Sequence, residues 1–312
     1  MAKKSILFTV FLSVFLTAYS QADDSRVGTT AYNFLKIGVG ARSQAMGSAF
    51  VGLADDETAL FFNPSGIVQN DKRSFSISYN NYLTDIQSGF LGYIHPYSEK
   101  INFGAYISYF NYGSFDEVDK EGNNLGTFGA GDLSLGLAYA QRFGEYLNLG
   151  TCFKVVYGTI KDYSSDAIAV DLGGLFKLKD NRTRMGFSLR NLGIQLKGYT
   201  ESHTDPLPTI FEVGFSHSLR GLPLLFTVDT AKPFDNDIFF DLGGELYALK
   251  PLILRAGWSS FGDNFKTDSD GDNWAGLTLG FGVLWKVYRF DYAFSSYADL
   301  GGVHRISVSG TL

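Results

Sequence analysis

The chain has 312 residues, a formal net charge of −6 and a mean hydropathy of −0.00, with 28 Phe, 18 Tyr and 36 Gly. The acidic balance argues against nucleic acid as a partner, because phosphate binding requires a basic surface. The single cysteine, Cys152, excludes an intramolecular disulfide and is expected to be a packed thiol. The aromatic and glycine content is unusual for a soluble enzyme and typical of a membrane β-barrel, which needs interfacial aromatics and small residues at crowded lumen positions.

Residues 1–22 are predicted to be a signal peptide. Lys3 and Lys4 precede an apolar run over residues 6–16, and small residues follow at the spacing of a cleavage site. The apolar run is too short to cross about 30 Å of hydrocarbon as a helix, and no other segment approaches 18 uninterrupted apolar residues. Any membrane residence must therefore come from strands.

Residues 23–72 are predicted to form a small N-terminal hatch. Asp55 is expected to be a helix N-cap with further acids in the first turn, where the helix dipole favours them, and Pro64 is expected to end that helix. The sequence Asn63–Gly66 has the residue pattern of a β-turn. The residues expected to define the hatch are Gly40, Ala41, Arg42, Met46, Gly47, Asp55, Asp56, Asn63, Pro64 and Gly66.

From Arg73 to Leu312 the chain is predicted to form about fourteen short antiparallel strands. Tight connections alternate with longer polar ones, as in an up-and-down barrel whose two rims differ. Each strand with its connection has about seventeen residues, enough for the 9–11 residues of a tilted spanning strand. An even strand count places both termini at the rim of tight turns, which is periplasmic in outer-membrane barrels. The predicted tight turns are 97–100, 144–145, 179–183, 220–222, 249–250 and 286–287; the opposite connections are 83–85, 113–129, 158–165, 196–208, 232–237, 262–273 and 297–302.

Charged residues fall in phase with the polar face of their own strands. This phase is a sharp test, because an Arg or Lys facing lipid at the bilayer midplane costs about 2–4 kcal/mol. A soluble β-sandwich would also alternate, with its charges on the outer face, but the number and length of the strands favour a barrel. The charges expected to face the lumen are Asp171, Arg190, Asp241, Glu245, Arg255, Arg289, Asp291 and Arg305, with Lys154, Glu212 and Asp229 in the same phase.

Several motifs resemble those of the PorV/PorQ family of outer-membrane barrels, distant relatives of the FadL fatty-acid transporters. The N-terminal ones are Gly40-Ala-Arg, Ala45-Met-Gly, Ala54-Asp-Asp and Asn63-Pro-Ser-Gly. Asn111-Tyr-Gly-Ser-Phe and Asn191-Leu-Gly-Ile-Gln-Leu-Lys-Gly-Tyr-Thr resemble PorQ in particular, and the likeness runs from about Thr29 to the C-terminus. The resemblance implies an all-β fold, a FadL-like antiparallel transmembrane β-barrel of about 14 strands with an N-terminal hatch. It also implies a part in type IX secretion.

Known catalytic motifs are missing from the sequence. It contains no Gly-x-Ser-x-Gly, His-Glu-x-x-His, Gly-x-x-x-x-Gly-Lys or Cys-x-x-Cys. The carboxylates Asp171, Asp241 and Glu245 could form an acid–base set, but the simpler interpretation is that they pair with Arg190, Arg255, Arg289 or hatch residues. The loop Asp268–Asn273 could hold Ca²⁺, although it lacks the later bidentate acid of an EF-hand loop, and solvation of a surface loop explains its acidity equally well. An enzyme and a cofactor are therefore not predicted.

The sequence thus predicts a non-enzymatic outer-membrane barrel that serves as a component or docking partner of type IX-like secretion and surface attachment. The expected partners are outer-membrane lipid and other secretion or attachment proteins or their cargo. Aromatic and proline residues in the longer loops suit a protein-binding rim. One alternative is a FadL-like channel for a hydrophobic small molecule, and another is a purely structural barrel.

Overall fold

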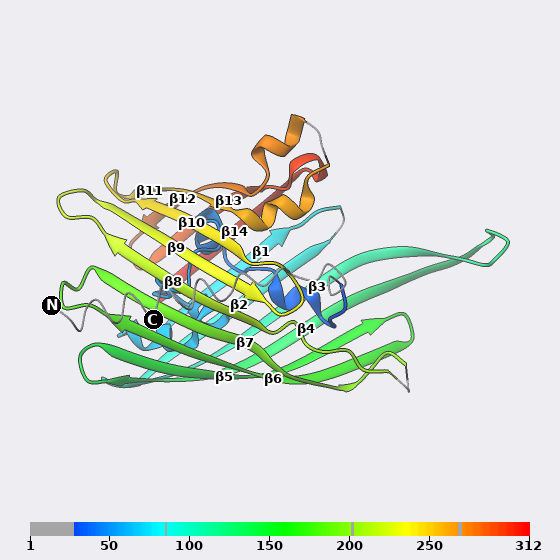
Figure 1. The fold of residues 1–312 in the computed structure, drawn as a ribbon, viewed down its shortest axis with the longest axis horizontal. Coiled ribbons are helices and arrows are strands. Elements are labelled where there is room, and N and C mark those ends of the chain that lie inside the picture. The colour runs from blue at the N-terminus through cyan, green and yellow to red at the C-terminus, as the bar shows by residue number, and fades with distance from the viewer. Residues whose placement is uncertain (1–27, 85, 201–202, 268–269) are drawn as a thin grey trace.

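The computed structural model describes residues 28–84, 86–200, 203–267 and 270–312. Within these residues, fourteen antiparallel strands close into one barrel (Figure 1). Every strand pairs with its neighbours in sequence, and β1 closes the sheet against β14. The predicted fourteen-stranded antiparallel barrel is confirmed. Among the described residues, no helix is long and apolar enough to cross a membrane. The predicted signal peptide, residues 1–22, lies outside the described residues.

The strands follow one another around the barrel in sequence order. They are β1 (Ser74–Asn81), β2 (Gln87–Ser98), β3 (Ile101–Val118), β4 (Asn124–Phe143), β5 (Leu147–Ile160), β6 (Tyr163–Lys177), β7 (Thr183–Lys197), β8 (Ile210–Ser218), β9 (Leu224–Pro233), β10 (Phe239–Leu246), β11 (Leu252–Ser259), β12 (Leu277–Trp285), β13 (Tyr288–Ser296) and β14 (Gly302–Thr311). All six predicted tight turns are present, at the rim where β1 begins and β14 ends; we call it the short-turn rim.

The opposite rim, the long-loop rim, differs from the prediction in three places. The loop predicted over 113–129 is mostly strand, so β3 and β4 form a hairpin that extends well beyond the barrel (Figure 1). Gly113, with a φ of 81°, lies in a bulge, and beyond it Phe115 stacks on Phe128 with ring centroids 5.5 Å apart. Cross-strand pairing thus continues through residues whose glycines suggested a loop. The loop predicted over 158–165 is similarly reduced to two residues, and the strand expected at Trp274 begins at Leu277 because Trp274 ends the 3₁₀ helix η5 (Asp270–Trp274).

The barrel is apolar outside and polar inside. On β4, Leu135 is 44% exposed whereas its neighbour Ser134 is fully buried. The luminal charges predicted from strand phase are buried or half-buried, while large apolar side chains such as Leu172, Phe240 and Leu254 are exposed on the outer face. This distribution is the reverse of that in a soluble protein and suits a lipid-facing surface.

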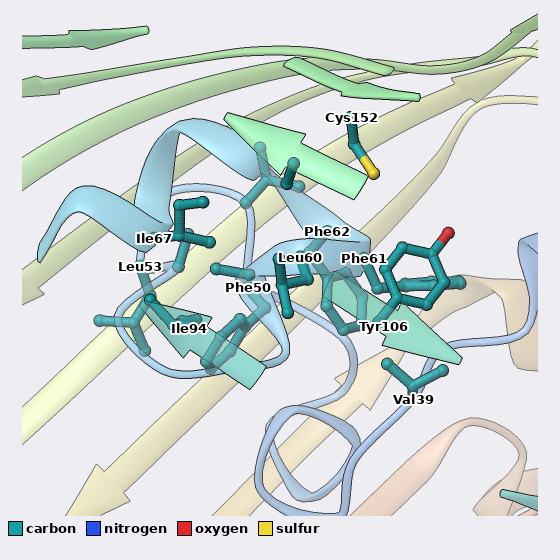
Figure 2. Packing of buried hydrophobic residues seen from close by; sticks show 14 of the residues in the cluster. Val39, Phe50, Leu53, Leu60, Phe61, Phe62, Ile67, Ile94, Tyr106 and Cys152 are labelled. Atoms are coloured by element: carbon teal, nitrogen blue, oxygen red, sulfur yellow. The ribbon is translucent and has the colours of Figure 1, made fainter. Parts of the chain in front are cut away.

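Residues 28–72, which we call the N-terminal segment, lie inside the barrel (Figure 1). The segment contains η2 (Asn33–Lys36), α2 (Ala41–Ala45), α3 (Ala59–Phe62) and η3 (Pro64–Gln69). Figure 2 shows that its apolar side chains, among them Phe50, Leu60 and Phe62, pack with Ile94, Tyr106 and Cys152 of the barrel wall. The main hydrophobic core is therefore the contact between this segment and the inner wall, and Cys152 is a packed thiol as predicted.

Candidate functional site

The predicted helix start at Asp55 is wrong. α3 begins at Ala59, and its N-cap residue Thr58 makes no side-chain capping bond. Asp56 instead accepts hydrogen bonds from the Thr58 backbone N–H at 3.0 Å and the Thr58 hydroxyl at 2.6 Å. The Asp55 carboxylate instead lies 2.6 Å from the Arg42 guanidinium. An ionised carboxylate gains more from a charge-assisted bond to arginine than from the N-terminus of a helix of a single turn.

The predicted turn at Asn63–Gly66 is present. The Gly66 N–H donates to the Asn63 carbonyl at 2.9 Å, and the Asn63 side chain accepts from the Ser65 N–H at 3.2 Å. Pro64 follows the end of α3 and opens η3, as expected from its missing N–H. The Asn63 amide also donates to Val51 O at 2.9 Å and to Gly174 O on β6 at 3.2 Å, so this residue ties the turn to the barrel wall.

Small residues of the predicted hatch motif let the segment approach the wall. Gly47 has a φ of 64°, and a Cβ there would lie 2.6 Å from the Leu242 carbonyl oxygen and 2.7 Å from the Trp258 nitrogen. Its N–H donates to Thr278 Oγ1 at 3.0 Å. Only glycine fits this position, both for backbone conformation and for space. Gly40, Ala41, Met46 and Gly66 also lie at close contacts within the lumen.

Arg42 connects the N-terminal segment to the barrel through a bidentate ion pair. Its Nε and Nη2 lie 2.9 and 3.0 Å from the two carboxylate oxygens of Glu245 on β10. Its Nη1 lies 2.6 Å from Asp55 and 3.0 Å from Asp56. Burial alone would lower the pKa of Arg42, but these three carboxylates raise it well above its usual value. The guanidinium is therefore a permanent charge at this position.

The barrel wall completes a closed circuit of charges around Arg42. Arg255 on β11 contacts Glu245 at 2.6 Å and Asp291 at 2.8 Å. Arg289 on β13 contacts Asp291 at 2.7 Å and Asp56 at 3.0 Å. Although burial raises the pKa of Asp56, Arg42 and Arg289 lower it to about 2. Three arginines and three carboxylates thus alternate in an ion-pair ring near the short-turn rim: Arg42, Glu245, Arg255, Asp291, Arg289 and Asp56.

The other predicted lumen charges form separate contacts. Arg190 makes a bidentate pair with Glu212, at 2.9 and 2.8 Å, and its guanidinium lies over the Phe61 and Phe62 rings. On the neighbouring strands, Lys154 pairs with Asp171 at 2.7 Å. The predicted pairing with a luminal arginine or a hatch residue is present for Glu245, whereas Asp171 pairs with Lys154 on the neighbouring strand instead.

Three predicted lumen charges, Asp229, Arg305 and Asp241, have no opposite charge in contact among the described residues; Asp229 accepts a hydrogen bond from the Val51 N–H at 2.6 Å instead. Arg305 is 2% exposed and donates to Ser295 Oγ at 2.9 Å, without a carboxylate partner among the described residues. Asp241 is 3% exposed, and its Oδ1 has no hydrogen-bond partner in the described part of the chain. The phase of the strands predicted that all three face the lumen, but the sequence contained no signal for which charges are paired.

A cavity of about 370 Å³ lies next to Asp241, near the long-loop rim. Its lining is mostly apolar, and aromatic residues come from the ends of strands and from the connections after them. Its volume falls in the range of small-molecule binding pockets, about 300–1,000 Å³. We call this space the outer cavity; sequence analysis did not identify it, because its walls come from segments far apart in the chain.

The loop Asp268–Asn273, which the sequence offered as an alternative Ca²⁺ site, lies partly outside the described residues. Asp268 and Ser269 lie outside the described residues, and among those described no group of three or more His, Cys, Asp or Glu side chains is placed to hold a metal ion.

The model of the family described as type IX secretion system protein PorV matches residues 20–220. The chain belongs to the PorV family. None of the curated protein sequences matches it. The narrower resemblance to PorQ stays a prediction. Family, closed barrel and apolar exterior together make the protein an outer-membrane β-barrel.

Solved structures share the fold at low sequence identity. The Ralstonia pickettii toluene transporter TbuX has a TM-score of 0.62 at 14% identity, with 88% of this chain and 98% of that one covered. The Pseudomonas putida toluene transporter TodX has a TM-score of 0.62 at 13% identity, with 87% and 97% covered. A Pseudomonas aeruginosa FadL homologue has a TM-score of 0.57 at 11% identity, with 84% and 96% covered. The FadL-like fold predicted from the sequence is confirmed.

Proposed function

We propose that this PorV-family barrel is a non-enzymatic docking component of type IX-like protein secretion and surface attachment. The matched family is described as a type IX secretion system protein, and this description supports a role in that secretion system. The observation that carries the docking role is the hairpin of β3 and β4, which extends beyond the barrel and exposes Phe115, Val118 and Leu125. Exposed apolar side chains on a projecting element are a feature of protein-binding surfaces.

The orientation and domain division follow from the same proposal. We place the short-turn rim in the periplasm, with both termini on that side, and the projecting hairpin at the cell surface. Residues 23–72 then act as a hatch within the 73–312 barrel. The ion-pair ring supports this role, because Arg42 and Asp56 fix the N-terminal segment to Glu245 on β10 and Arg289 on β13.

The docking role is tested in a strain that lacks the gene, complemented with variants of the full chain. Replacement of residues 114–128 by a short turn should leave surface-destined proteins with C-terminal sorting domains in the periplasm. The matched control is Asp162→Asn, in the two-residue connection between β5 and β6 at the same rim, and it should restore surface attachment. Outer-membrane fractionation and a heat-dependent gel shift verify that each barrel is folded. Full restoration by the shortened variant would refute docking through the hairpin.

A channel for a hydrophobic small molecule is the second candidate. The outer cavity and the fold shared with toluene transporters favour it. Under this function, the deletion strain should attach surface proteins normally and lose uptake of a hydrophobic substrate. The two phenotypes are therefore opposite, and both can be measured in the same strain.

A further inference from the structure

The outer cavity is bounded on one side by a continuous row of aromatic rings. Successive ring centroids are 5.3 Å apart from Phe239 to Phe261, 5.7 Å from Phe261 to Phe265, 4.8 Å from Phe265 to Tyr297 and 5.6 Å from Tyr297 to Tyr82. All five residues line the cavity. We call them the aromatic arc. Such a wall accepts the apolar body of a ligand and attracts a cation to its ring faces.

The charged side chains that line the cavity differ in whether they are already paired. Lys36 lies 2.6 Å from Asp235, and Arg190 is held by both oxygens of Glu212. Asp241 also lines the cavity, but it makes no ion pair among the described residues, and its buried Oδ1 accepts no hydrogen bond there. A buried carboxyl oxygen without a donor is costly, and a donor from a ligand would remove that cost.

This pattern discriminates between ligand head groups. An anionic head would need Arg190 or Lys36, whose charges are both satisfied within the protein, and it would bring no hydrogen-bond donor to Asp241 Oδ1. A wholly apolar ligand would fit the aromatic arc but leave Asp241 Oδ1 without a donor. An ammonium group can donate a hydrogen bond to Asp241 Oδ1 and supplies a positive charge next to it.

We propose that the outer cavity is a binding site for a small amphiphilic amine, whose ammonium donates to Asp241 and whose apolar body lies along the aromatic arc. The site depends on the cavity alone. It requires neither a role in secretion nor passage of the ligand through the barrel.

The test measures calorimetric binding of three probes to the purified full-length protein in detergent: phenethylamine, the neutral 2-phenylethanol and the anionic phenylacetate. Wild type should bind phenethylamine at least about tenfold more tightly than either of the others, because hydrogen bonds to charged groups are the stronger ones. Asp241→Asn should remove that preference, whereas Asp116→Asn on the exposed hairpin should keep it. Phe265→Ala should weaken the binding of phenethylamine and of 2-phenylethanol to the same extent.

Equal binding of the three probes by wild type, or tighter binding of phenylacetate, would overturn the proposal without any variant. An unchanged preference in folded Asp241→Asn protein would overturn the role of Asp241. Surface-protein attachment is measured separately in cells, so a failure of this site and a failure of the docking function are distinguishable.

Discussion

Arg42→Met tests whether the ion-pair ring fixes the N-terminal segment in the lumen. The substitution retains an unbranched side chain about as long as the aliphatic stem of arginine and removes the charge that contacts Glu245, Asp55 and Asp56. Glu245 keeps Arg255 at 2.6 Å and Asp56 keeps Arg289 at 3.0 Å, whereas Asp55 retains only Arg184 at 3.9 Å. Breaking a buried ion pair costs about 3–5 kcal/mol, and the retained partners place this variant near the lower end.

The measurement is urea unfolding of the refolded barrel, followed by its heat-dependent gel shift, with Lys161→Met as the control. Lys161 pairs with Glu117 at 2.5 Å, but its side chain is 39% exposed, so solvent screens the pair and its loss should cost far less than loss of the buried Arg42 contacts. Adding Glu245→Gln to Arg42→Met should cost less than the sum of the two single changes, because the partners form one network. Equal stability of Arg42→Met and the control would refute the ring as an anchor.

Three further outcomes are expected. Leu135→Arg places a charge on the lipid-facing side of β4 and should reduce barrel stability by about 2–4 kcal/mol, measured by unfolding in lipid vesicles, whereas Thr127→Arg on the projecting hairpin should be neutral. Because the pKa of Asp56 is lowered to about 2, its contribution is present above its usual pKa near 4 and should disappear as the pH falls from about 4 to 2, so acid unfolding curves of wild type and Asp56→Asn should converge in that interval. Deletion of residues 29–68 should leave a barrel that inserts and conducts ions in planar bilayers, since fourteen strands enclose more space than their side chains fill; equally low conductance of both proteins would contradict a removable hatch.

The barrel was predictable because the alternation of lipid-facing and lumen-facing side chains can be read from each strand separately. A side chain on a spanning strand faces either lipid or lumen, so phase alone placed residues such as Asp171 and Arg255 correctly inside. The projecting hairpin was missed because Gly113, Gly126 and Gly129 suggested a loop. There the strands pair with each other outside the barrel, where the lipid-facing alternation no longer applies.

The candidate site was less predictable because its geometry depends on the closed topology. Asp55 had the sequence context of an N-cap, but the fold brings Arg42 close enough to compete for its carboxylate. No local pattern distinguishes Asp241, which has no paired cation, from Glu245, which has two. The aromatic arc likewise combines β10 with the connections after β1, β11 and β13, and only barrel closure makes these neighbours.

The two ends of the lumen differ in a way that separates binding from passage. At the short-turn rim, the ion-pair ring joins the N-terminal segment to two strands, β10 and β13. At the long-loop rim, the outer cavity offers space that a small molecule can enter. A molecule bound beside Asp241 would still have the packed segment beneath it, and passage would require breaking several buried charge contacts at once. Under the proposed function, this asymmetry suits a barrel that binds at its long-loop rim and stays closed at its short-turn rim, as a docking component would.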